Sequence, residues 1–230
     1  MTISRKEFIS LGLAGAAVFT LNRHAEAQLV ETTGDWTQNE LKGLMNRPAH
    51  YRQVYDITKI NNGIFLNNIK NSLNGFQFGF GAAPEDINIV AALHGPANLI
   101  NFDDSMWAKY HLGDFTGVKD PSSGAPAARN IFYHSGAQPT NRNPDDEHSI
   151  YQDHSIQGLQ SRGVHFLICH TATEEQSRAL IKRLNLSVQP EEMVKDLLAH
   201  AIPGAIVVPS MVAVVALLQL EARFSYITLA

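Results

Sequence analysis

Apolar residues along the chain fall into short uninterrupted runs and into longer segments where they recur every three or four positions. The short runs, such as INIVAAL at residues 87–93, are typical of strands that a sheet buries on both faces. Strands are predicted at residues 51–57, 87–93, 164–169, 205–208 and 224–229. Helices are predicted at residues 37–46, 59–76, 97–110, 149–162, 173–184, 191–200 and 211–222. Because strands and helices alternate, we expect an α/β fold: an open, mostly parallel sheet with helices on both faces.

The first 27 residues differ from the rest and predict an export signal. Arg5 and Lys6 provide a positive start, a short apolar run follows, and residues 25–27 (AEA) fit the small-x-small pattern of a cleavage site. Residues 4–9 resemble a twin-arginine signal with Lys6 in place of the second arginine, so twin-arginine export and general secretion both stay open. An uncleaved N-terminal anchor is the alternative. We expect a periplasmic protein with no stable membrane span after processing.

The remaining chain divides into an arm and one domain. Residues 28–48 are polar and predict an N-terminal arm, and residues 49–230 predict a single α/β domain. Within this domain, residues 113–147 are rich in proline and glycine and predict a long loop insertion. Loops of that length are uncommon inside compact domains and are often functional when they occur.

Composition and charge exclude several classes of function. The 230 residues are 44% hydrophobic, which is enough to bury a sizeable core. The formal net charge is −4 and the charges are scattered, so we expect no nucleic-acid partner, which would require a basic stripe. The chain has no G-x-G-x-x-G, P-loop or G-x-S-x-G motif, so nothing indicates nucleotide binding or serine hydrolase chemistry. We expect no cofactor.

Three predicted strands end in polar residues or in glycine and proline. These ends are LHGPAN at residues 93–98, ICHT at residues 168–171 and VPS at residues 208–210. The carboxyl ends of parallel strands meet at one edge of a sheet, and open α/β sheets form their sites beyond that edge. We therefore expect the functional site to lie at these three strand ends.

Cys169 is the only cysteine of the chain, so it has no partner for an internal disulfide and is free, modified or paired with another molecule. Thr173 and Gln176 have the spacing of a capping box. Thr171 and Glu174 have the same spacing. Either pair places Cys169 within a few residues of a helix N-terminus, where the helix dipole stabilises a thiolate.

Two histidines accompany this cysteine at the predicted strand ends. A protonated His170 would also stabilise a thiolate, and His94 would serve as an acid/base or hydrogen-bond partner of the sulfur. The alternatives are that Cys169 is a small apolar residue that finishes a buried strand, and that His94 is a hydrogen-bonded turn residue. Cys169, His170 and His94 are the candidate catalytic residues.

Four further residues at the same strand ends are candidate ligand-binding residues: Gly95, Asn98, Thr171 and Ser210. Ser210 has a simpler interpretation as the N-cap of the last helix.

A second polar cluster contains DDEH at residues 145–148 and DH at residues 153–154. Carboxylates and imidazoles together can bind a divalent metal ion. The spacing matches no strong metal motif, and negative charge is also favourable at the start of a helix. We therefore interpret the cluster as an acidic loop that leads into a helix, and we expect no metal site.

Three segments of the C-terminal half stand out together: GVHFLIC at residues 163–169, IPGAIVVPS at residues 202–210, and the terminal helix and strand. Through these segments the C-terminal half resembles the DsrE-like sulfur-relay family. The first half agrees more loosely, through an early strand, an asparagine-bearing helix and a strand that ends in HGP at residues 94–96. With these included, the resemblance covers roughly residues 50–230.

The resemblance implies a flavodoxin-like or Rossmann-like three-layer sandwich that assembles into homotrimers or homohexamers. It also implies that Cys169 carries sulfur as a persulfide. The chain departs from the family in its export signal, in the insertion at residues 113–147, and in the sequence HTAT at residues 170–173 after the cysteine. Because of these departures, the resemblance does not indicate which molecule exchanges sulfur with Cys169 or in which direction the sulfur moves.

The resulting hypothesis is a periplasmic sulfur carrier or sulfurtransferase-like protein that exchanges sulfur with a small sulfur compound or a thiol partner protein. The alternative is a non-enzymatic oligomeric protein that binds a ligand or a metal through the strand-end pocket or the cluster at residues 145–154. A third interpretation is an oligomeric scaffold that is held together by the apolar terminal helix and the arm.

Overall fold

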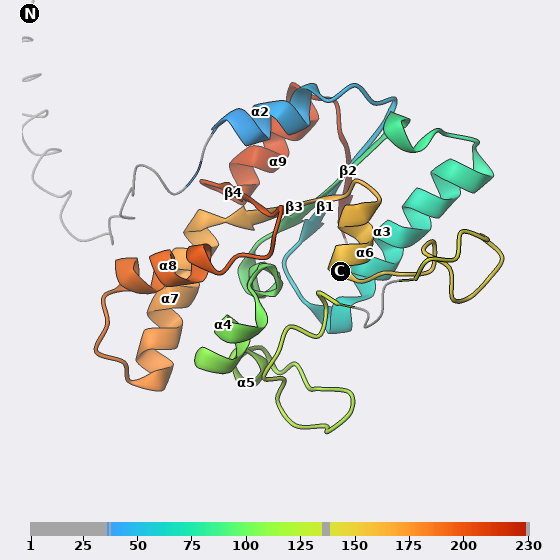
Figure 1. Cartoon of the computed structure of the whole chain (residues 1–230). Coiled ribbons are helices and arrows are strands. Elements are labelled where there is room, and N and C mark those ends of the chain that lie inside the picture. The colour runs from blue at the N-terminus through green and yellow to red at the C-terminus, as the bar shows by residue number, and fades with distance from the viewer. Residues whose placement is uncertain (1–35, 37, 135–138, 229–230) are drawn as a thin grey trace, which may run out of the picture. The chain divides into compact units, whose positions relative to one another are not determined.

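All neighbouring strands of the structure run parallel in one five-stranded sheet (Figure 1). The computed structural model describes residue 36 and residues 38–134 and 139–228. The strands, in the spatial order β4-β3-β2-β1-β5, are β1 Tyr51–Ile57, β2 Ile87–Leu93, β3 His165–Cys169, β4 Ile206–Val208 and β5 Ser225–Thr228. The predicted α/β fold with an open parallel sheet is therefore confirmed. Its parallel strands also bring the three polar strand ends to one edge.

Helices cover both faces of this sheet and complete three layers (Figure 1). On one face, α2 and α9 bury Leu44, Val214 and Leu218 against the sheet. On the other face, α3 and α6 pack side chains such as Phe65 and Leu159 into a larger core. The helices are α2 Gln38–Asn46, α3 Ile64–Asn74, α4 Asp104–Lys109, α5 Leu112–Thr116, α6 Ile156–Ser161, α7 His170–Leu184, α8 Pro190–Ala199 and α9 Met211–Leu220.

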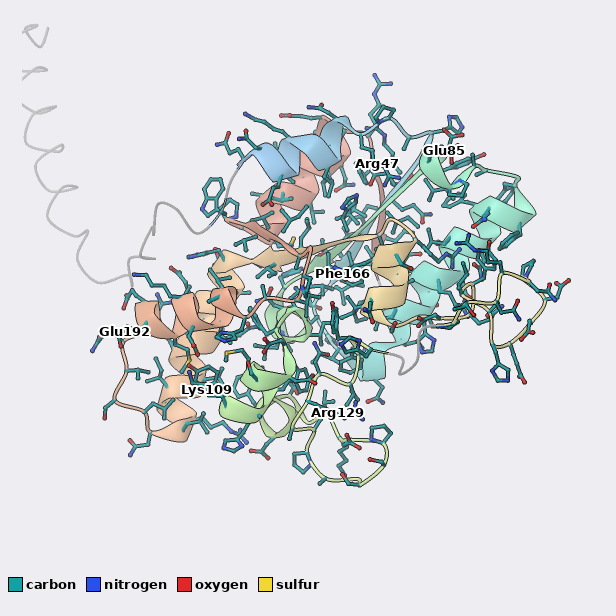
Figure 2. The ribbon with its side chains drawn as sticks, viewed as in Figure 1. Arg47, Glu85, Lys109, Arg129, Phe166 and Glu192 are labelled. Carbon is teal, nitrogen blue, oxygen red and sulfur yellow. The ribbon has the colours of Figure 1, made fainter. Side chains whose placement is uncertain are left out.

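Apolar side chains lie in the interior of the fold, and charged side chains lie at its surface. Phe166 of β3 is fully buried and lies in the interior, whereas Lys109, Arg129 and Glu192 are exposed at the periphery (Figure 2). All seven residues of β2 are buried, as its apolar sequence predicts for the central strand of a parallel sheet. No helix within the described residues is both long enough and apolar enough to span a membrane.

The helix predicted at residues 59–76 begins later than expected. Asn61, Asn62 and Gly63 form a short turn whose positive φ values of 42°, 52° and 75° lie outside the right-handed helical region, so α3 begins only at Ile64. A Cβ atom on Gly63 would lie 2.9 Å from the ring of Phe132, so glycine is required for this close approach. After Asn74, residues Gly75–Gly79 continue as a π-helical turn.

The single helix predicted at residues 97–110 is wrong. Residues Gly95–Asn101 form a 3-10 helix, and Phe102 is extended and bridges to Ala201. Helix α4 then starts anew, because the Asp103 carboxylate accepts hydrogen bonds from the backbone N–H groups of the next turn.

The loop predicted at residues 113–147 differs at both ends. Helix α5 occupies its start, and the helix predicted at residues 149–162 forms only as α6, so the described residues 139–155 contain no helix. The side chain of Ser155 caps α6 by accepting a hydrogen bond from the N–H of Gly158. The amide of Asn130 fixes the loop by donating to the carbonyls of Ile100 and Phe102.

The predicted export signal at residues 1–27 lies outside the described residues, and so does most of the first half of the arm at residues 28–48. The described part of the arm forms α2, which packs on the sheet through Leu44. The side chain of Arg52 holds this segment beside β1, because it donates hydrogen bonds to the carbonyls of Met45, Arg47 and Ala49.

Candidate functional site

Cys169 ends β3 and is the N-cap of α7. Its Sγ atom accepts a hydrogen bond from the N–H of Ala172 at 3.4 Å and another from the N–H of Met211 at 3.4 Å. Ala172 lies in the first turn of α7, and Met211 is the first residue of α9. The starts of two helices therefore meet at the sulfur, and both helix dipoles favour negative charge there.

Helix α7 begins three residues earlier than predicted, and the predicted capping boxes are not what starts it. The sulfur of Cys169 takes the capping position instead. The hydroxyl of Thr173 donates to the carbonyl of Cys169, and the hydroxyl of Thr171 donates to the carbonyl of Pro209. These two hydrogen bonds connect the first turn of α7 to the end of β3 and to Pro209, which follows β4.

The thiol of Cys169 is 4% exposed and packs in the core on the α9 face of the sheet. Burial raises the pKa of this thiol, while the N–H donors of Ala172 and Met211 act in the opposite direction. The negative charge of Glu175 adds a smaller increase to the pKa of Cys169. At rest the site therefore favours the protonated thiol.

His94, immediately after β2, belongs to a hydrogen-bonded group that also contains Asp56 and Tyr226. The His94 Nε2 atom lies 2.7 Å from Asp56 Oδ1, and the Tyr226 hydroxyl donates to Asp56 Oδ2 at 2.7 Å. The side chains of His94 and Asp56 are 18% and 19% exposed, so the pair is partly shielded from water. This arrangement fixes the orientation of the imidazole, as carboxylates do for catalytic histidines.

The strand register brings this group to the same edge and face as the cysteine. Leu93 and Ile168 are the last paired residues of β2 and β3, so His94 and Cys169 both follow the end of this ladder. Side chains alternate between the faces of a sheet, and Ala92 and Cys169 belong to the core on the α9 face. His94 is extended and two residues beyond Ala92, so its side chain points to that face as well.

Sequence reasoning did not find Asp56 and Tyr226. Asp56 is the only acidic residue of its strand and comes one position before the strand ends, which is a weak signal. Tyr226 is 43% exposed on β5 and carries no signal of its own. It reaches Asp56 because β5 pairs with β1, and the sequence does not reveal which strands are neighbours.

His170 is buried at the first position of α7, and its Nδ1 atom lies 3.8 Å from the carboxylate of Glu174. Glu174 is also buried, and burial raises the pKa of its carboxyl group, against the effect of His170 and Arg178. His170 thus has a carboxylate neighbour on its own helix, one turn away from the cysteine.

The buried side chain of Asn98 stabilises the backbone around Cys169 by hydrogen bonds. Its Oδ1 atom accepts from the N–H of Cys169 at 2.9 Å, and its Nδ2 atom donates to Thr173 Oγ1 and to Gln176 Oε1. Both amide protons and the amide oxygen are engaged, so this side chain holds the backbone of Cys169 in place.

Gly95 and Ser210 have backbone roles. Gly95 has a φ of 51°, and a Cβ atom there would lie 3.1 Å from the carbonyl oxygen of Thr58. Glycine therefore permits the tight turn after His94. Ser210 is the N-cap residue of α9 by backbone conformation, but its side chain makes no capping hydrogen bond.

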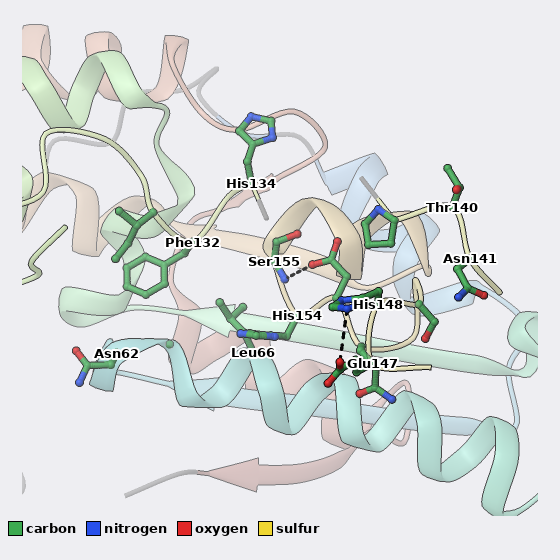
Figure 3. A pocket seen from close by; sticks show the side chains of 16 residues that line it. Asn62, Leu66, Phe132, His134, Thr140, Asn141, Glu147, His148, His154 and Ser155 are labelled. Carbon is green, nitrogen blue, oxygen red and sulfur yellow. Dashed lines mark hydrogen bonds and ion pairs between the residues drawn. The ribbon is translucent and has the colours of Figure 1, made fainter. Parts of the chain in front are cut away.

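A separate cavity of about 810 Å³ lies between the start of α3 and the long loop (Figure 3). Leu66 and Phe132 line it together with the imidazoles of His134, His148 and His154. The lining also includes Glu147, whose carboxylate lies 3.5 Å from His148. Among residues 36, 38–134 and 139–228, no three His, Cys, Asp or Glu side chains gather closely enough to hold a metal ion.

Comparison with known proteins does not place the chain in a family: no family model, no curated protein and no solved structure matches it.

Proposed function

We propose that the protein is a sulfur carrier that holds sulfane sulfur as a persulfide on Cys169. The observation that carries this proposal is the meeting of the α7 and α9 starts at one sulfur atom, at the edge where parallel sheets form their sites. Two N–H donors at the sulfur stabilise a thiolate or persulfide anion once it forms. The sequence resemblance to the DsrE-like sulfur-relay family supports the same function.

The proposed reaction is a thiolate exchange that needs no external oxidant or reductant. The Cys169 thiolate attacks the outer sulfur of a persulfide or polysulfide donor, and the sulfur–sulfur bond of the donor breaks. The donor leaves as a thiolate that takes up a proton, and Cys169 becomes a persulfide. An acceptor thiolate reverses these steps and removes the sulfur.

Burial of the cysteine favours a small donor over a folded protein. With Cys169 4% exposed, a partner's bulky active-site loop has no direct access to the sulfur, whereas a polysulfide of a few atoms is small enough to enter. We therefore assign a small anionic sulfur compound as the donor, and an external thiol as the acceptor because the chain has no second cysteine.

Sulfur trapping tests the proposal. Purified protein is treated with polysulfide, freed of excess reagent and reacted with cyanide, and the thiocyanate formed is measured against protein concentration. We expect stoichiometric thiocyanate from the native chain and from the control His148→Gln, and none from Cys169→Ser. Equal thiocyanate from Cys169→Ser would rule the proposal out.

We further propose that this carrier is exported and forms a homotrimer or homohexamer. The export signal predicted at residues 1–27 supports a periplasmic location. An outward face of α9 supports assembly, because Val212, Leu217 and Leu220 are 68%, 37% and 82% exposed on a helix that has no charged residue.

The cavity of about 810 Å³ favours a second candidate function, the binding of a small polar molecule. It offers imidazole and amide groups above the apolar side chains of Leu66 and Phe132. A thermal-shift screen of small polar compounds tests this function. A hit that is retained in Cys169→Ser and lost in His154→Ala would support it, and a screen without such a hit would contradict it.

A further inference from the structure

We infer that the cavity between the start of α3 and the long loop binds a neutral sugar, a small molecule with many hydroxyl groups and no charge. This inference rests on the second candidate function, ligand binding in this cavity, and names the class of the ligand. It is carried by the place of the cavity in the sheet topology, by a buried hydroxyl without a partner, and by the charge of the lining. It does not depend on the sulfur chemistry proposed for Cys169.

The cavity begins where an open parallel sheet forms its sites. The chain proceeds from β1 through β2 and β3 to β4 on one side, and β5 then pairs on the other side of β1. In such sheets, ligands bind beyond the carboxyl ends of the strands, where the strand order reverses. Asn62 and Gly63 line the cavity and belong to the connection that leaves the carboxyl end of β1. One wall of the cavity therefore lies at this point of the sheet.

A buried hydroxyl in the lining lacks a hydrogen bond. Ser149 lines the cavity and is 1% exposed, and its Oγ atom has no hydrogen-bond partner among the described residues. Burying a hydroxyl without a hydrogen bond costs free energy, so nearly all buried hydroxyls are satisfied by protein, water or a bound molecule. The backbone of Ser149 is already used, because its N–H donates to Asp146 and its carbonyl accepts from Gln152. The Ser149 hydroxyl is therefore the group that a ligand in the cavity would complete.

Further groups of the lining offer both donors and acceptors (Figure 3). The Nδ1 atom of His134 lies 2.7 Å from Gln157 Oε1, an amide oxygen that only accepts, so Nδ1 carries the proton and Nε2 is the acceptor of the neutral ring. The amide of Asn62 and the imidazole of His154 are exposed in the lining as well. Because a hydroxyl group both donates and accepts, a ligand with many hydroxyls matches this mixed set.

The charge of the lining disfavours an anion. Among the residues that the structure describes, no lysine or arginine lines the cavity, and Glu147 and Asp153 contribute carboxylates. The ammonium of Lys70 donates to Gln152 Oε1 at 3.2 Å, so the protein already uses this cation. A phosphate or carboxylate in the cavity would therefore meet like charge, without the arginine or lysine that usually binds such groups.

The two carboxylates are also not arranged to hold a cation. The carboxylate of Asp153 serves the start of α6, because it accepts from the N–H of Ser155 at 2.8 Å and leaves no room for a Cβ atom at Gly158. The side chain of Glu147 is 87% exposed and lies 3.5 Å from His148, so water screens its charge. A neutral ligand therefore fits the lining better than either kind of ion.

Leu66 and Phe132 give the cavity an apolar side (Figure 3). Both residues are buried, and Gly63 allows the ring of Phe132 to approach the start of α3. A sugar ring carries C–H groups on its faces and hydroxyls around its edge, so it needs an apolar surface next to mixed donors and acceptors. The volume of about 810 Å³ lies within the range of small-molecule sites, which is about 300–1,000 Å³.

Saturation-transfer NMR with matched probes tests the class of the ligand. The purified chain is mixed in turn with glucose, galactose and mannose, and a sugar that binds is compared with its 6-phosphate and its 2-amino derivative. We expect at least one of the three hexoses to bind, and to bind the native chain and Cys169→Ser equally. Its two charged derivatives should bind about tenfold more weakly or not at all, because one meets like charge and the other meets no open carboxylate.

Ser149→Ala separates a ligand role of the hydroxyl from a structural role. We expect this variant to bind the sugar about tenfold more weakly, the contribution of one good hydrogen bond, and to keep its urea midpoint or raise it, because no internal hydrogen bond is lost. The matched control is Ser187→Ala, which changes an exposed serine between α7 and α8 and should alter neither quantity. His134→Ala removes the Nε2 acceptor and should weaken binding as well, whereas His50→Ala, at an exposed residue outside the lining, should not.

Several results would overturn the inference. They are a failure of all three hexoses to bind, charged derivatives that bind as tightly as the neutral sugar, and a folded Ser149→Ala variant with native affinity. If the screen of polar compounds gives a charged ligand that is lost in His154→Ala, the class assigned here is wrong while ligand binding by the cavity stands. If no compound binds, both fail, and the proposed sulfur chemistry of Cys169 is unaffected.

Discussion

Cys169 combines an observed structural role with the proposed chemical one. Its sulfur caps α7, a position that serine, threonine, aspartate or asparagine normally occupies, and it is the only thiol of the chain. The same N–H groups that need an acceptor at the start of a helix are the ones that stabilise a sulfur anion. Structure and proposed chemistry therefore depend on the same hydrogen bonds.

This double role leads to a first expectation about stability. Cys169→Ala removes the acceptor of the N–H groups of Ala172 and Met211, whereas Cys169→Ser keeps an oxygen in the same place. We expect Cys169→Ala to lower the free energy of unfolding by about 1 kcal/mol or more, and Cys169→Ser to lower it less. Urea titration of the three proteins checks this order. Equal stability of the alanine variant and the native chain would show that the sulfur caps nothing.

The raised pKa of Cys169 has a consequence at alkaline pH. Since burial raises the pKa in the folded state, the unfolded chain loses this proton at a lower pH than the folded chain. Between the two pKa values the unfolded state binds fewer protons, so stability falls as pH rises. We expect the stability of the native chain, measured relative to Cys169→Ala, to decline above the ordinary thiol pKa of 9.0. A difference that is constant across this range would contradict the burial effect.

At the scale of elements, strand limits followed from the sequence and helix limits often did not. The strand Ile87–Leu93 was predicted to the residue, because a strand buried on both faces is apolar along most of its length, here at every position except Asn88. The start of α3 was missed because it depends on the distant ring of Phe132, which packs against Gly63. The break at Phe102 was missed because its bridge partner, Ala201, lies about a hundred residues further along the chain.

The start of α3 gives a second stability test. Gly63→Ala forces a side chain into a φ of 75° and brings its Cβ atom 2.9 Å from the ring of the buried Phe132. We expect a loss of about 1–3 kcal/mol in the free energy of unfolding. The matched control is Gly43→Ala in α2, where nothing lies within 4 Å and alanine favours the helix, so stability should stay equal or rise. A Gly63→Ala protein as stable as this control would refute the close approach.

At the scale of the whole molecule, the candidate site could be predicted only in part. Cys169 and His94 were found because polar residues that end apolar strands stand out in a sequence. Asp56 and Tyr226 join them only through the neighbouring positions of β5, β1 and β2, and strand order is not visible in the pattern of residues. The cavity beside the long loop depends on the path of that loop, which the pattern does not reveal either.

The exposed apolar face of α9 makes assembly testable. We expect Leu220→Glu to shift the protein to smaller particles in light-scattering chromatography, because it places a charge among the exposed apolar side chains of α9. Leu186→Glu, at a residue that is 36% exposed after α7, is the control and should leave the particle size unchanged. A native chain that is monomeric at all concentrations would refute the proposed assembly.

The central claim, that Cys169 carries sulfur, is tested most directly by intact mass. The purified chain and Cys169→Ser are each exposed to polysulfide, and their masses are read with and without a reductant. We expect the native chain to gain the mass of one sulfur atom and to lose it on reduction, and we expect the serine variant to gain nothing. A native chain whose mass is unchanged by polysulfide would contradict the account and leave Cys169 as a structural cap of α7.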